Sequence, residues 1–177
     1  MRVLGVDPSS RSLGWALVVS NTPVAIGVWT PKPKSAPSLQ RLMQCSEAMD
    51  VLMNMYEPDE LVIEVIRVST SHDTTRVLSR IEAAVLIAAH RHGITPDRIH
   101  EHAVGEARAA YFKEGGISKH DAHDVVRTLY PQLDWLPKLT DSGRDGPGLD
   151  QSDALIAALA RDKLAARPKK KRRRKSG

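Results

Sequence analysis

The chain has 177 residues, of which 41% are hydrophobic and 4% aromatic, enough for one domain with a core built mainly from Leu, Val, Ile and Ala. Its single cysteine excludes an internal disulfide and a cysteine-rich zinc site, and no 18-residue apolar stretch is present to span a membrane. The formal net charge is +5.

The positive charge is concentrated at the C-terminus. Eight of the 26 lysines and arginines lie in residues 167–177, which leaves 18 basic against 21 acidic residues elsewhere. Such a run cannot bury apolar surface, so we expect a folded domain over residues 1–166 and a disordered basic tail over 167–177. The tail suits nucleic acid, although a solubilising or import-like segment has the same composition. Its expected DNA contacts are Lys169, Lys170, Lys171, Arg172, Arg173, Arg174 and Lys175.

Three strands are expected to open the chain, over residues 2–7, 14–20 and 24–30. The turn signals between them predict an antiparallel meander. A helix is predicted over 39–56, where Leu and Met recur at helical spacing, and an apolar strand follows over 60–66.

The second half of the chain is expected to be mainly helical. The expected elements are a helix over 72–92, a strand over 98–102, helices over 105–113 and 118–130, and a final helix over 149–166. Residues 131–148 are too rich in Pro, Gly and Asp for regular structure. This order predicts an α/β domain with a mixed sheet and helices on its faces.

Four carboxylates occupy unusual positions. Asp7 and Glu64 each interrupt an otherwise apolar strand, where burying an unpaired charge is costly. Asp150 and Asp153 lie one turn apart on one face of the last predicted helix. If these elements meet, the four charges repel each other unless cations neutralise them, and an all-oxygen set favours Mg²⁺ or Mn²⁺.

Each acid also has an ordinary interpretation. Asp7 can end its strand in an Asx-turn, and Glu64 can lie on an exposed strand face. Asp150 can be an N-cap, with Asp153 interacting favourably with the helix dipole.

Two histidine pairs share a face of their elements. His100 and His102 lie on one strand, and His120 and His123 lie on one helix. Neither pair has a third ligand nearby in the sequence, so we expect no zinc site. His120 and His123 could contact phosphate, but their favoured interpretation is as ordinary surface residues of the helix.

The stretch GVDPSSRSLGWAL resembles the opening of RuvC-type Holliday-junction resolvases, where a glycine-flanked Asp-Pro-x-Ser turn links the first two strands. LVIEVI resembles their acid-bearing strand, and DQSDALIAALA follows in the same order. The resemblance covers about residues 1–165. It implies a ribonuclease H-like fold, with helices on both faces of a mixed five-stranded sheet.

The resemblance also implies an activity. It points to a homodimeric endonuclease that nicks symmetric strands of four-way DNA junctions during recombination or repair. Asp7, Glu64, Asp150 and Asp153 match the four catalytic carboxylates of the family, which implies two Mg²⁺ ions per active site, replaceable by Mn²⁺. The implied setting is the cytoplasm of a bacterial cell or of a phage-infected host.

Further residues are candidates for contact with DNA. Lys119 matches a basic position of the family that faces DNA, and Arg108 falls near another. Ser9 and Arg11 could reach a phosphate or simply cap the turn after the first strand. An aromatic residue that follows the strand acid in bacterial members is missing here, and Arg67 is the nearest substitute, for stacking, phosphate binding or a dimer surface.

Two other functions stay open. One is a nuclease of the same fold that acts on other branched DNA or on structured RNA. The other is a junction-binding protein that does not cut, although the presence of all four acids argues against it.

Overall fold

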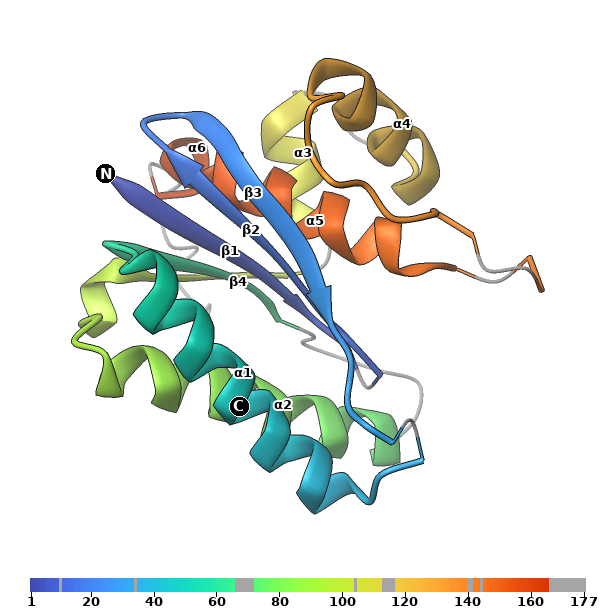
Figure 1. Cartoon of the computed structure of the whole chain (residues 1–177). Helices are drawn as coiled ribbons and strands as arrows, with labels where there is room; N and C mark the ends of the chain where they lie inside the picture. The colour runs from blue at the N-terminus through green and yellow to red at the C-terminus, as the bar shows by residue number, and fades with distance from the viewer. Residues whose placement is uncertain are drawn as a thin grey trace, which may run out of the picture.

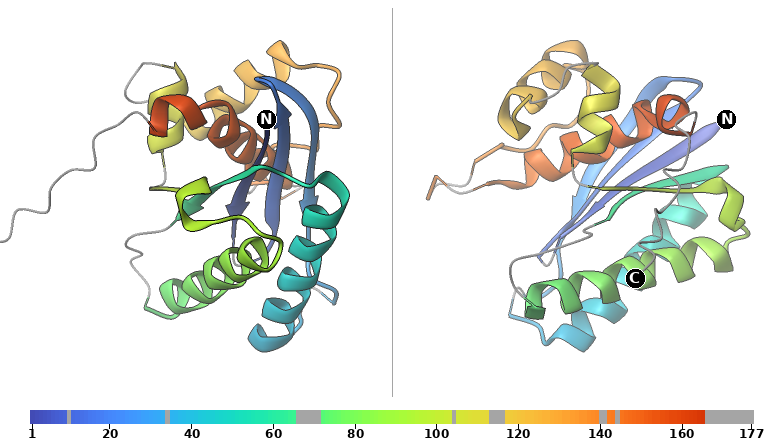
Figure 2. Two further views of the ribbon diagram at one scale, coloured as in Figure 1. Left: turned by 90° about the vertical axis from the view of Figure 1, so that its left-hand side faces the viewer. Right: turned by 180° about the vertical axis from the view of Figure 1, so that it is seen from behind.

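A five-stranded mixed sheet carries helices on both of its faces in the computed structural model of the protein (Figures 1 and 2). The strands are β1 (Arg2–Pro8), β2 (Leu13–Val19), β3 (Thr22–Trp29), β4 (Glu60–Val65) and β5 (Ile99–Ala103). The helices are α1 (Ser38–Tyr56), α2 (His72–Arg91), α3 (Glu106–Phe112), α4 (Lys119–Leu129), α5 (Pro147–Leu159) and α6 (Arg161–Ala165), with a 3₁₀ turn at Pro96–Arg98. The structure describes residues 1–9, 11–33, 35–65, 72–103, 105–112, 117–139, 142–143 and 145–165.

The strand order is β3-β2-β1-β4-β5. The first three strands form the predicted antiparallel meander, whereas β4 runs parallel to β1 and β5 runs parallel to β4. Parallel neighbours need crossover connections, which α1 and α2 supply. The predicted α/β class with a mixed five-stranded sheet is therefore confirmed.

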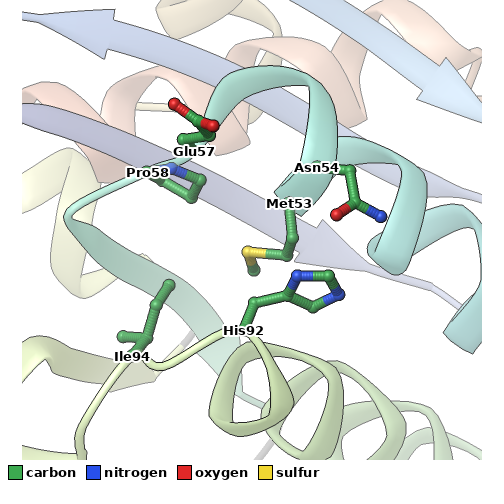
Figure 3. Close-up of a pocket in the computed structure, with 6 residues that line it drawn as sticks. All are labelled: Met53, Asn54, Glu57, Pro58, His92 and Ile94. Atoms are coloured by element: carbon green, nitrogen blue, oxygen red, sulfur yellow. The ribbon is translucent and has the colours of Figure 1, made fainter.

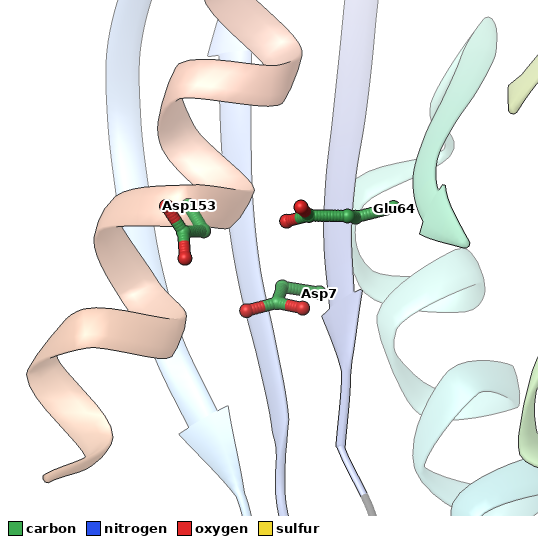
Figure 4. A group of neighbouring side chains, drawn as sticks. All are labelled: Asp7, Glu64 and Asp153. Atoms are coloured by element: carbon green, nitrogen blue, oxygen red, sulfur yellow. The ribbon is translucent and has the colours of Figure 1, made fainter. Parts of the chain in front are cut away.

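Alternation along the strands decides which side chains face which helices. In β1, Leu4 and Val6 belong to the apolar cluster under α1 and α2, and so does Ile63 of β4. Val6 pairs directly with Ile63. The next residue along each strand, Asp7 or Glu64, therefore points to the opposite face of the sheet, toward α5 (Figure 4).

Helix α5 lies directly on the backbones of β1 and β2. Within Gly148–Ala158, every residue except Asp150 is buried. A Cβ atom on Gly5 would collide with the carbonyl oxygen of Ala154, and one on Gly14 would collide with the carbonyl oxygen of Asp150. Because these two strand positions lack a Cβ, the helix can approach the sheet closely.

The end of the chain differs from the prediction. Instead of one helix over 149–166, two helices are present, with Ala160 between them. The first begins earlier than predicted because Pro147 takes the first helical position, with Gly146 as the N-cap. Asp150 therefore lies inside the first turns of α5, and its interpretation as an N-cap is wrong.

The segment before α5 is largely irregular, as predicted. Its described residues form one isolated bridge, between Leu139 and Asp145. Across the part of the chain that the structure describes, no helix is both long and apolar enough to cross a membrane.

Candidate metal centre and active site

Three carboxylates from three different elements meet at one point (Figure 4). Asp7 comes from β1, Glu64 from β4 and Asp153 from α5. One oxygen of each lies within 4.8 Å of an oxygen of the other two. Glu64 and Asp153 are buried, and Asp7 is half-buried. The structure thus brings together three of the four acids singled out in the sequence.

The fourth acid, Asp150, lies at the edge of this cluster. It precedes Asp153 by one turn of α5 and is half-buried. Its Oδ2 accepts a hydrogen bond from the hydroxyl of Ser12, at 2.6 Å. Ser12 belongs to the turn between β1 and β2, so this bond ties the turn to α5. Nothing in the local sequence pattern distinguishes Ser12 from its neighbouring serines, so its contact with Asp150 could not be predicted.

Lys119 places a positive charge among the acids. Helix α4 begins at this residue because Ser118 caps the helix and accepts the backbone N–H of Asp121, at 3.1 Å. The Lys119 ammonium lies 3.0 Å from Asp153 Oδ2, 3.4 Å from Asp150 Oδ1 and 3.9 Å from Asp7 Oδ2. One ammonium therefore pairs with three carboxylates.

The pKa values follow from this crowding. Burial raises the pKa of Asp7 well above its ordinary value, and the charge of Glu64 raises it further. Burial also raises the pKa of Glu64 to about 7, with Asp153 adding to the effect. The pKa of Asp153 is raised by burial against the attraction of Lys119. Burial lowers the pKa of Lys119, but the surrounding carboxylates outweigh it and raise that pKa.

The donor set of the cluster fits a divalent cation. Asp153 Oδ1 is buried, and no described residue donates a hydrogen bond to it. The guanidinium Nε of Arg108, on α3, is 3.7 Å away from this oxygen. Glu64 Oε1 accepts the backbone N–H of Gly105, at 3.1 Å, which orients that carboxylate. An oriented all-oxygen set with excess negative charge is the chemistry that Mg²⁺ and Mn²⁺ prefer.

The other candidates for DNA contact lie either in the turn after β1 or outside the described residues. Ser9 caps the turn after β1: its hydroxyl donates to the carbonyl of Ser12 and accepts the N–H of the same residue, each at 3.0 Å. Arg11 lies on this turn and is exposed. Arg67 and the tail, residues 167–177, lie outside the described residues.

His123 is buried, so its interpretation as a surface residue is wrong. It shares the inner face of α4 with Lys119, Ala122 and Val126, and its exposed fraction is 0%. Its Nδ1 lies 3.0 Å from the carbonyl oxygen of Gly148 at the start of α5. The spacing 119, 122, 123 and 126 is helical, but only packing against α5 shows which face of α4 is the inner one.

A separate pocket lies at the other end of β4 (Figure 3). It is lined by Met53, Asn54, Glu57, Pro58, His92 and Ile94. These residues come from the C-terminal end of α1, from the segment before β4 and from the segment just after α2. Glu64 lies near the far end of that strand, so the pocket is not part of the acidic cluster.

The pattern of the family described as crossover junction endodeoxyribonuclease RuvC matches residues 3–160. The chain belongs to this family. The matched range includes Asp7, Glu64 and Asp153, the three acids that meet in this structure.

Individual RuvC relatives cover most of the chain. The crossover junction endodeoxyribonuclease RuvC of Mycobacterium avium is 34% identical over 135 residues, which is 73% of this chain and 69% of that protein. The RuvC of Methylococcus capsulatus is 26% identical over 160 residues, covering 89% and 88% of the two chains. A structure of T. thermophilus RuvC in complex with Holliday junction substrate has a TM-score of 0.72 at 19% identity, covering 93% and 94% of the two chains. This likeness confirms the fold predicted from the resemblance.

Proposed function

We propose that this RuvC-family protein is a metal-dependent endonuclease that nicks symmetric strands of four-way DNA junctions during recombination or repair. The observation that carries the proposal is the meeting of Asp7, Glu64 and Asp153 beside Lys119. The substrate is supported by relatives named crossover junction endodeoxyribonuclease and by the similar fold of a RuvC solved with Holliday junction substrate.

The four acids form the metal site of this proposal. Asp7, Glu64 and Asp153 would hold Mg²⁺, with Asp150 at the edge of the site, and we propose two ions per active site, replaceable by Mn²⁺. Held by these carboxylates, Mg²⁺ would supply activation of the attacking water and charge stabilisation at the leaving oxygen of a phosphodiester. The chain itself keeps the carboxylates oriented, through the Gly105 amide on Glu64 and the Ser12 hydroxyl on Asp150.

Basic residues around the acids serve the DNA backbone in this proposal. Lys119 and Arg108 border the carboxylates, where a phosphate would otherwise meet only negative charge. Ser9 and Arg11 extend this surface along the turn after β1. We also assign contacts to Arg67 and to the basic residues of the tail, on the sequence alone.

The proposal includes a homodimer. Two nicks in opposite strands need two active sites related by a two-fold axis, which matches the symmetry of a four-way junction. Helix α1 offers apolar area for a second copy of the chain, because it exposes Leu39, Met43, Val51 and Met55.

The direct test is cleavage of four-way, three-way and linear DNA with and without Mg²⁺. We expect Mg²⁺-dependent nicks in the four-way junction alone. Asp7→Asn should lower the rate by about 100-fold or more, because it removes a ligand charge, while junction binding stays equal or becomes tighter. Asp97→Asn is the matched control, since this acid is exposed on the turn before β5.

The open alternatives correspond to other outcomes of this test. Cutting of three-way DNA or of structured RNA at similar rates would favour a nuclease with a broader substrate. Binding of four-way junctions without cutting in Mg²⁺ or Mn²⁺ would favour a binding protein and would refute the proposed activity.

A further inference from the structure

His123 joins the helix that carries Lys119 to the helix that carries two of the acids. Its Nδ1 faces the carbonyl oxygen of Gly148, which can only accept, so Nδ1 carries the proton and donates the bond. Gly148 precedes Asp150 by two residues in the first turn of α5. Lys119 precedes His123 by one turn on the same face of α4.

The His123 ring is held in one place. Trp135 presents its ring edge-on, with the ring centres 5.3 Å apart and the planes at 81°. The Trp135 indole N–H in turn donates to the carbonyl of Tyr130, at 2.9 Å. Gln151 of α5 accepts the backbone N–H of Leu136, at 2.8 Å, and so fixes the segment that carries Trp135. No described residue forms a hydrogen bond with the second ring nitrogen, Nε2.

This enclosure leaves the bond to Gly148 as the polar contact that orients the imidazole. Burial lowers the pKa of His123 below its ordinary value, although the hydrogen bond to the Gly148 carbonyl acts to raise it. The ring is therefore neutral near pH 7. The neutral ring donates one hydrogen bond, to the Gly148 carbonyl, and this bond links α4 to α5. Because the ring carries no charge, the strength of the link does not depend on salt.

We propose that His123 is a positioning residue that sets the place of the Lys119 ammonium relative to Asp150 and Asp153. The inference rests on the proposed function of this site and deepens it. Lys119 is the first residue of α4, so the point from which its side chain reaches the acids moves with that helix. The link through His123 lies one turn from Lys119 on α4, and on α5 it lies two residues before Asp150 and five before Asp153.

The placement of Lys119 has two opposing consequences. An ammonium at 3.0 Å from Asp153 competes with a divalent ion for the same carboxylate, and so weakens metal binding. The same ammonium is available to a phosphate at the site, and so supports turnover. If α4 is held less firmly against α5, metal binding should therefore become tighter and cleavage slower. Loosening α5 would instead separate the ligands and weaken metal binding.

A pair of variants with nearly the same shape isolates the hydrogen bond. His123→Asn retains an N–H near the position of Nδ1, whereas His123→Leu fills a similar volume without a donor. His120→Leu is the matched control, because His120 lies on the same helix but pairs with Asp145, in the segment between α4 and α5, at 3.2 Å. The measurements are Mn²⁺ affinity of the full chain without DNA, by electron paramagnetic resonance, and cleavage of a saturating four-way junction in excess Mg²⁺.

We expect His123→Leu to bind Mn²⁺ about 3- to 10-fold more tightly and to cleave about 10- to 100-fold more slowly. The second range is typical of changes to residues that orient a metal site without contacting the metal. His123→Asn and His120→Leu should behave like the unaltered protein in both measurements. In a Lys119→Ala background, His123→Leu should change neither quantity, because its effect passes through Lys119.

Two results would overturn the assignment: weaker Mn²⁺ binding by His123→Leu, or an undiminished effect of this change in the Lys119→Ala background. If His123→Leu shows no cooperative unfolding transition, His123→Ala replaces it with the same expected directions. If the variants show the expected changes in Mn²⁺ affinity but the unaltered protein cuts no junction, the proposed function is refuted and the role of His123 stands.

Discussion

Replacing Glu64 by Gln should stabilise the metal-free protein above pH 7. Burial, with the neighbouring charge of Asp153, raises the pKa of Glu64 from 4.5 to about 7. The folded protein therefore holds this proton more tightly than the unfolded chain does. The ionised carboxylate destabilises the fold increasingly between pH 4.5 and pH 7, and by a constant amount above that range.

The size of the effect follows from the two pKa values. At about 1.4 kcal/mol per pH unit, the ionised Glu64 costs about 3 kcal/mol of stability at pH 8. Gln removes the charge but keeps an oxygen in the place of Oε1, which accepts the N–H of Gly105 at 3.1 Å. We therefore expect Glu64→Gln to recover most of this free energy, and to recover almost none below pH 4.5.

The assay is urea unfolding in EDTA at pH 4 and at pH 8, with thermal unfolding alongside. For a chain of this length, about 3 kcal/mol corresponds to a midpoint higher by about 6–12 °C. Added Mg²⁺ should narrow the difference, because it stabilises the unaltered carboxylate. Glu101→Gln is the control, since Glu101 is exposed on the neighbouring strand β5. A variant that is less stable at pH 8 in EDTA, or equally stabilised at both pH values, would refute the reasoning.

Three further outcomes are expected. Gly14→Ala should destabilise the protein by about 1–3 kcal/mol in urea unfolding, because its Cβ collides with the carbonyl of Asp150; an unchanged midpoint would show that α5 can shift without cost. Light scattering should give twice the 19.5 kDa of one chain, and a mass of one chain in the presence of junction DNA would count against the dimer. Deleting residues 167–177 should weaken binding to junction and duplex DNA alike and reduce the slope of log K against log salt by roughly four to seven, with turnover at saturation unchanged. If duplex affinity and slope stay the same, the tail is not a DNA arm.

Much of the fold, and two of the site acids, could be predicted from the local sequence pattern. The strands over 2–7 and 60–66 are short apolar runs bounded by turn residues, so they could be recognised without any knowledge of their neighbours. A carboxylate inside an apolar strand is conspicuous because its burial is costly, which is why Asp7 and Glu64 stood out. The turn residues and the strand-helix order also sufficed for the mixed sheet.

The composition of the site depended on the tertiary structure. The sequence did not distinguish Asp150 at the edge of the cluster from Asp153 within it, because both lie on one helix face and only the approach of α5 to the sheet separates them. It placed His123 at the surface, because a helical spacing shows that a face exists but not what covers it. Ser12 and Asp150 are 138 residues apart in the sequence and meet only because α5 lies on Gly14. Such contacts arise from how whole elements pack, and no local period encodes that.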